Sequence, residues 1–94
     1  MINKFKKIAI IGSGTMGQGI AQVCAVAGYQ VLLYDIQAGL LKTAISILRK
    51  NLQTLVQKER IQPHDASAAL NRIATVSDFR QLQVDLVIEA VIEN

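Results

Sequence analysis

Three glycines form the part of this sequence whose residue types and spacing point most clearly to chemistry. Residues 8–36 read IAIIGSGTMGQGIAQVCAVAGYQVLLYDI, and within them Gly12, Gly14 and Gly17 form the pattern G-x-G-x-x-G. The pattern follows a short apolar run and opens a helix-like segment, which is the setting in which it binds dinucleotides. We therefore expect the backbone amides of this loop to hold a diphosphate.

Each of the three glycines has its own role in such a loop. Gly12 permits the tight turn out of the strand, Gly14 lets the diphosphate touch the backbone, and Gly17 lets the helix lie close against the sheet. The unpaired N–H groups and the positive dipole at the helix start then face the phosphates. The pattern does not require Gly19, which either eases the packing of helix on strand or is simply tolerated. The expected cofactor-binding residues of the loop are Gly12, Ser13, Gly14, Thr15, Met16 and Gly17.

An acidic residue at the end of the second apolar run adds a second element of the dinucleotide pattern. Asp35 lies eighteen residues after Gly17, close to the spacing of ~20 at which a carboxylate holds the adenosine ribose hydroxyls. A 2′-phosphate would meet like charge there, and the next residue is Ile36 rather than an arginine, so we expect NAD rather than NADP. FAD proteins share the pattern, usually with glutamate at this position, and remain an alternative. Capping of the following helix is the other role open to Asp35.

The elements that must position these residues are strands alternating with helices. We expect strands over 8–11, 30–35, 72–76 and 85–90, helices over 15–27, 37–57 and 63–70, and a single turn over 77–82. The helix over 37–57 is amphipathic, because its apolar positions step by three and four. The first helix is almost free of charge and is expected to be buried, with Met16, Ile20, Val23 and Ala27 on one apolar stripe. Gly28 follows it, where a left-handed residue is favoured.

This alternation predicts an α/β fold with a parallel sheet and right-handed crossovers. The expected architecture is a Rossmann-type doubly wound sheet with strand order 3-2-1-4, which is the first half of the fold plus one strand beyond the switch point. Because the full fold needs more chain, residues 1–94 are expected to form an incomplete, truncated N-terminal NAD-binding domain.

Composition fits a globular chain that binds small molecules. Of the 94 residues, 51% are hydrophobic and 18% charged, which argues against disorder. Apolar runs are too short to span a membrane, and no signal peptide is expected. The net charge is +3, but the ten basic residues are scattered and aromatic residues make up 4%, so nucleic acid is not an expected partner. Cys24 is the single cysteine, which excludes an internal disulfide, argues against a zinc site and fits a reducing cytoplasm.

The quoted motifs, a long helix and the closing stretch DLVIEAVIEN together resemble the N-terminal part of the 3-hydroxyacyl-CoA dehydrogenases. These include the short-chain 3-hydroxybutyryl-CoA enzymes and members of bacterial phenylacetate degradation. The resemblance covers essentially the whole sequence. It implies oxidation of the 3-hydroxyl of an acyl-CoA with NAD as cofactor, and a following helical domain that forms a homodimer.

The resemblance also implies further binding residues. Glu93 matches a family residue near the nicotinamide ribose, although an exposed acid is the alternative, and Glu89 is a weaker candidate. Asn51 and Lys58 match a hydroxyl residue and a lysine that contact CoA from the long helix. Asn51 departs from the usual serine, and a solvated polar face would explain both residues without a ligand.

No catalytic residue is expected within these 94 residues. The family uses a histidine oriented by a glutamate, with a serine and an asparagine, all beyond the fourth strand. His64 does not match that histidine and is expected to be a surface residue. Two alternatives stay open: another NAD-dependent dehydrogenase of β-hydroxyacids or sugar acids, and a non-catalytic dinucleotide-binding module.

Overall fold

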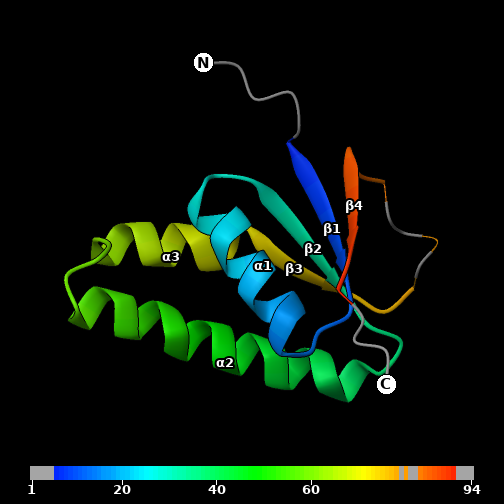
Figure 1. Cartoon of the computed structure of the whole chain (residues 1–94), viewed down its shortest axis with the longest axis horizontal. Helices are drawn as coiled ribbons and strands as arrows, with labels where there is room; N and C mark the ends of the chain where they lie inside the picture. The colour runs from blue at the N-terminus through cyan, green and yellow to red at the C-terminus, as the bar shows by residue number, and fades with distance from the viewer. Residues whose placement is uncertain (1–5, 79, 81–82, 91–94) are drawn as a thin grey trace.

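A computed structural model of the chain describes residues 6–78, 80 and 83–90. The elements alternate as the sequence predicts (Figure 1), with end points that differ by at most one residue. The expected turn over 77–82 includes residues that lie outside the described ones. In chain order the elements are β1 (Lys7–Ile11), α1 (Thr15–Val26), β2 (Gln30–Tyr34), α2 (Ala38–Gln57), α3 (Pro63–Asn71), β3 (Ile73–Val76) and β4 (Leu86–Glu89).

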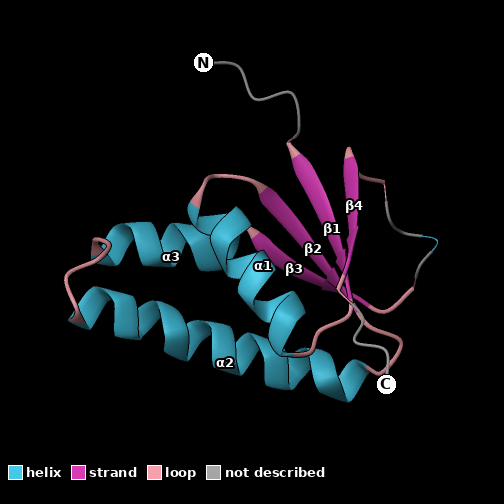
Figure 2. Cartoon of the chain, viewed as in Figure 1, coloured by secondary structure: helices cyan, strands magenta, loops and turns pink. Residues whose placement is uncertain are grey.

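The four strands form one parallel sheet in the order β3-β2-β1-β4 (Figure 2), which confirms the predicted order. In its central row, Ile10 of β1 is paired with Leu33 of β2 and with Ile88 of β4. From β1 the chain adds β2 and then β3 on one side, and it then crosses the sheet to place β4 on the other side of β1. The carboxyl ends of β1 and β4 therefore meet at a switch point. In open α/β sheets, ligands bind beside such a point.

All three helices cover the same face of the sheet (Figure 1), and the core lies between these two layers. Ile10, Val31 and Leu33 of the sheet are fully buried, together with Leu48 of α2. The buried positions of α2 repeat at intervals of three and four, as its amphipathic pattern predicts; they are Leu41, Ala44, Leu48 and Leu52. Within the described residues, no helix is long and apolar enough to cross a membrane.

Helix α1 packs through a different stripe from the expected apolar one. Its buried residues are Gly17, Ala21 and Ala25, spaced by four, whereas Met16 is 51% exposed and Val23 is 69% exposed. Both sides of this helix are apolar, so hydrophobicity does not distinguish them. The side with the smallest residues faces the sheet because it allows the closest approach. The stripe of large apolar residues is therefore not the side of α1 that is buried.

Two helices end in the same hydrogen-bonded motif, with a left-handed residue just past the helix. After α1, Gly28 has φ of +105°, its amide donates to the Ala25 carbonyl and the Tyr29 amide donates to the Cys24 carbonyl. This confirms the position predicted for Gly28. After α2 the left-handed residue is Glu59, with φ of +58°.

Asp85 joins the start of β4 to the start of β1. Its Oδ2 accepts hydrogen bonds from the amides of Lys6 and Lys7, each at 2.9 Å, and its own amide donates to the Lys7 carbonyl at 3.0 Å. The amides of Lys7 and Lys6 hold the pKa of this carboxyl below its usual value. The strand that borders the switch point is thus anchored at its far end.

Candidate functional site: a dinucleotide cleft

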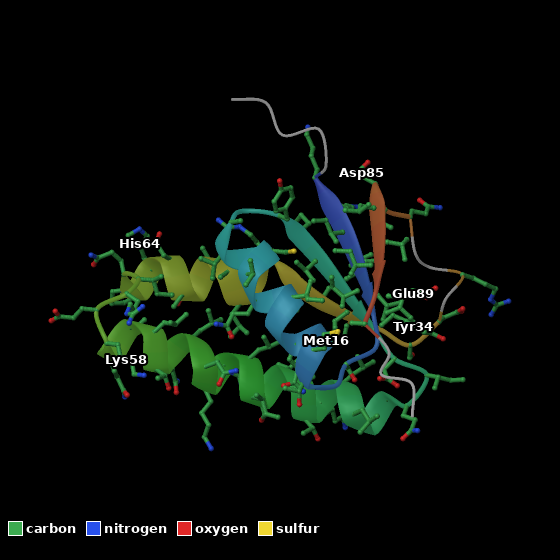
Figure 3. The ribbon with its side chains drawn as sticks, in the orientation of Figure 1. Met16, Tyr34, Lys58, His64, Asp85 and Glu89 are labelled. Atoms are coloured by element: carbon green, nitrogen blue, oxygen red, sulfur yellow. The ribbon has the colours of Figure 1, made fainter. Side chains whose placement is uncertain are left out.

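A cleft of about 350 Å³ lies at the carboxyl ends of the strands. It is formed where the loop after β1, the end of β2 and the residue after β4 come together. Figure 3 shows Met16 and Tyr34, which both line the cleft, near these strand ends. The lining includes Gly12, Ser13, Gly14, Met16, Asp35 and Ala90.

Each of the three glycines of the loop lacks a Cβ for a different steric reason. Gly12 has φ of +104°, a value that residues with a Cβ rarely adopt, and its amide donates to the Tyr34 carbonyl at 2.8 Å. A Cβ on Gly17 would collide with the carbonyl of Gly12. A Cβ on Gly14 would meet no protein atom within 4 Å, so the space beside it is open to a ligand. The close contact of Gly17 is thus with the loop itself as well as with Ile10 of the sheet.

The first turn of α1 faces the cleft with free hydrogen-bond donors. Gly14 is the N-cap residue, and in the described part of the chain no side chain caps this helix end. The first intrahelical bond runs from the Gln18 amide to the Gly14 carbonyl at 2.9 Å. Amides of the preceding turn have no carbonyl within the helix to bond to. Such donors, together with the helix dipole, favour an anion.

Asp35 lies one residue past β2 and is bonded to the glycine loop. Its Oδ2 accepts from the Ser13 amide at 3.0 Å and from the Ser13 hydroxyl at 2.8 Å, while its Oδ1 accepts from the Gln37 amide at 3.0 Å. Partial burial raises the pKa of the Asp35 carboxyl, but hydrogen bonds from Gln37, Ser13 and Ile36 outweigh this effect and hold the pKa below its usual value. The carboxylate is therefore charged at neutral pH, and it lines the cleft.

Comparison with known proteins identifies the family. Residues 7–94 match the model of the 3-hydroxyacyl-CoA dehydrogenase NAD-binding domain. The chain belongs to this family. Its recognised cofactor is NAD, and the loop, the open space beside Gly14 and the charged Asp35 fit that molecule.

Individual relatives agree with the family match. The chain is 45% identical to 3-hydroxyadipyl-CoA dehydrogenase of Escherichia coli K12 over 99% of its own length and 20% of that protein. It is 39% identical to 3-hydroxybutyryl-CoA dehydrogenase of Bradyrhizobium diazoefficiens, over 94% of this chain and 30% of the relative. A crystal structure of 3-hydroxybutyryl-CoA dehydrogenase from E. coli K12 superposes with a TM-score of 0.92 at 42% identity, covering 99% of this chain and 20% of the other. The chain thus spans less than a third of these relatives.

The residues expected to contact CoA lie far from the NAD cleft. Asn51 lies within α2 and Lys58 follows its last residue, two turns further on. Both are exposed, and Figure 3 places Lys58 at the end of α2 that is remote from Met16. The seven positions between them are close to two helical turns, so the two residues lie on the same side of α2.

The structure tests two of three further expectations, those for Glu89 and Gly19, and not the one for Glu93. Glu93 lies outside the described residues. Glu89 is the last residue of β4, is exposed and does not line the cleft. Gly19 is exposed, and a Cβ there would meet no atom within 4 Å, so it does not serve the packing of α1 on a strand.

Neither His64 nor Cys24 belongs to the NAD cleft. The His64 side chain is 83% exposed and lies 3.1 Å from the Asp65 carboxylate, at the same remote end of the molecule as Lys58 (Figure 3). Burial raises the pKa of the Cys24 thiol, which disfavours the reactive thiolate. The described residues contain no group of three or more potential metal ligands.

The contact between Ser13 and Asp35 was not anticipated from the sequence. The two residues are 22 positions apart, and a serine between two glycines has no distinctive spacing to an acid. The available signal was its hydroxyl, because a buried hydroxyl usually has a hydrogen-bond partner and only 2% of Ser13 is exposed.

Proposed function

We propose that this chain supplies the NAD-binding part of an enzyme that oxidises (S)-3-hydroxyacyl-CoA to 3-oxoacyl-CoA. The observation that carries the proposal is the meeting of the glycine loop, the open start of α1 and the Asp35 carboxylate around one cleft. The family match supplies the substrate class, and the relatives named above are CoA-ester dehydrogenases.

Different residues of the cleft are proposed to contact different parts of NAD. In this proposal the amides following Gly14 hold the diphosphate, the open space beside Gly14 admits it, and Asp35 accepts hydrogen bonds from the adenosine ribose. Met16, with half of its surface exposed at the cleft, and Thr15 complete the loop. Glu93 is proposed to lie near the nicotinamide ribose, on the basis of the family resemblance.

The proposed reaction transfers a hydride from C3 of the hydroxyacyl group, while the hydroxyl proton goes to a base. NAD supplies the hydride acceptor when it is bound. We assign no such base within the described residues, because His64 lies at the remote end of α2 and Cys24 does not line the cleft. We therefore propose that these 94 residues bind NAD without turning over acyl-CoA on their own.

Lys58 and Asn51 are proposed to bind the CoA moiety, Lys58 through a phosphate and Asn51 through its amide. Lys58→Ala in the complete enzyme should raise KM for the acyl-CoA about three- to tenfold, because one exposed charge contact is worth roughly 1 kcal/mol. The affinity for NAD should stay the same. Lys50→Ala, which removes a neighbouring exposed lysine of α2, is the matched control. An unchanged KM in Lys58→Ala would remove Lys58 from the substrate site.

We also propose a homodimer for the complete enzyme, on the basis of the family resemblance, and a cytoplasmic location, on the basis of its cysteine usage. Cys24 is partly buried and forms no disulfide within the chain, which fits a reducing compartment. Sedimentation of the complete enzyme would test the dimer, and a monomer at micromolar concentration would contradict it.

Cofactor selectivity tests the core of the proposal. Calorimetry should show binding of NAD, with NADP weaker by at least tenfold, because a 2′-phosphate would meet the charged Asp35. Asp35→Asn should weaken NAD binding and narrow the gap between the two cofactors. Asp85→Asn is the matched control, since Asp85 lies at the opposite ends of the strands (Figure 3). Equal affinity of the unaltered protein for NAD and NADP would contradict the assignment.

A further inference from the structure

Ser13 is a buried residue whose donor groups are all used within the chain. It is 2% exposed and is the one buried polar residue in the part of the chain that the structure describes. Its amide and hydroxyl both donate to Asp35, and its carbonyl accepts from the Gln18 side-chain amide at 2.9 Å. Ser13 therefore has no donor left to offer a phosphate, in contrast to the amides that follow Gly14.

The two bonds from Ser13 occupy one side of the Asp35 carboxylate. Oδ2 accepts both of them, at 3.0 and 2.8 Å, while Oδ1 accepts the Gln37 amide at 3.0 Å. An ionised carboxylate offers about four acceptor sites, so the capacity left for a ligand is on Oδ1. Ser13 on one carboxylate oxygen and the Gln37 amide on the other together hold the Asp35 side chain in one orientation at the end of β2.

We propose that the Ser13 hydroxyl is a positioning group that acts through Asp35 and sets the selectivity for dinucleotides with a free 2′-hydroxyl. This inference rests on the proposed function, because it assumes that Asp35 reads the adenosine ribose. A hydrogen bond from a hydroxyl to a charged carboxylate is among the stronger kinds. It orders the acceptor before the ligand arrives, which reduces the cost of ordering on binding. It also keeps the charge where a 2′-phosphate would have to lie.

The test is a comparison of NAD and NADP affinity in Ser13→Ala. The variant removes the hydroxyl and keeps the amide bond to Asp35. We expect NAD to bind about tenfold more weakly, as for the loss of one charge-assisted hydrogen bond, with NADP affinity unchanged or slightly higher. The dissociation constant for NADP divided by that for NAD should therefore fall about tenfold. Ser13→Thr, which restores the hydroxyl, should recover the ratio, and Ser46→Ala on the exposed side of α2 should leave it unaltered.

A double-mutant cycle separates positioning from general damage to the loop. In an Asp35→Asn background, Ser13→Ala should change the ratio by less than about twofold, because the group on which it acts has lost its charge. Equal weakening of NAD and NADP by Ser13→Ala, or an unchanged ratio, would overturn the role of Ser13. Failure of the unaltered protein to bind NAD would instead overturn the proposed function, so the two failures can be told apart.

Discussion

Gly17 lies so close to Gly12 that a Cβ on Gly17 would collide with the carbonyl oxygen of Gly12. This contact fixes the start of α1 over the loop that follows β1, and thus fixes the direction in which the free amides of the helix point. We therefore expect substitution by alanine to have opposite effects on stability at Gly17 and at Gly19 of this helix.

Gly17→Ala should destabilise the chain by about 3 kcal/mol or more, because the backbone must move to relieve the collision. Gly19→Ala should instead stabilise it by about 0.5–1 kcal/mol, since alanine is the better helix former and its Cβ would meet no atom within 4 Å. Urea unfolding measures both changes. A destabilising Gly19→Ala would mean that another surface packs on this side of α1.

The packing of α1 through its small residues can be tested directly. Ala21→Leu should cost about 1–3 kcal/mol, because Ala21 is 0% exposed and the added atoms have no space. Val23→Gln should change the free energy of unfolding by less than about 0.5 kcal/mol, since Val23 is 69% exposed. Thermal unfolding of the two variants gives the comparison. The reverse order would restore the apolar stripe containing Val23 as the buried one.

The turn between α2 and α3 contains a residue in an unfavourable conformation. Glu59 has φ of +58°, while its amide bonds to the Val56 carbonyl at 3.0 Å and the Arg60 amide bonds to the Leu55 carbonyl at 2.8 Å. Glu59→Gly should raise the stability by about 0.5–1 kcal/mol, because glycine adopts this conformation without strain. Glu59→Ala keeps the strain and should bring no such gain. The difference between the two melting temperatures is the measurement.

The pKa of Asp35 provides a readout that is independent of ligand binding. Because its pKa in the folded chain lies below the ordinary value, the stability that Asp35 contributes is complete above the unfolded pKa of about 3.9. It is lost as the pH falls through the lower, folded pKa. Carboxyl NMR titration should show this low pKa, and Ser13→Ala should raise it. The pKa of Asp85, held down by Lys7 and Lys6, should not move in that variant, and a parallel shift of both would point to a change in the whole fold.

The sequence predicts the parts of this molecule that depend on local chemistry. Gly28 follows an apolar helix and takes the left-handed conformation, and alternating strands and helices give the order β3-β2-β1-β4. Gly12 and Gly17 are explained by a turn and by a close approach, both of which require the absence of a Cβ. These features follow from residue type alone.

Features that depend on distant contacts could not be predicted in the same way. The buried side of α1 was missed because Ala21 and Val23 are both apolar, and only the approach of Gly17 to the loop decides between them. The bond from Ser13 to Asp35 joins residues 22 positions apart. Glu59 takes a left-handed conformation because the chain must turn between two packed helices, and its residue type gives no sign of this.

The arrangement of all three helices on one face of the sheet also bears on how the chain responds to denaturant. On β4, Val87 points away from the helices, because it alternates with Ile88, the partner of Ile10, which contacts Gly17 of α1. Its side chain is 49% exposed and already contacts water before unfolding. The steepness of a urea transition scales with the surface newly exposed on unfolding. These 94 residues should therefore unfold over a broad range of urea concentration, and any polypeptide layer laid across the second face should sharpen the transition as well as shift its midpoint.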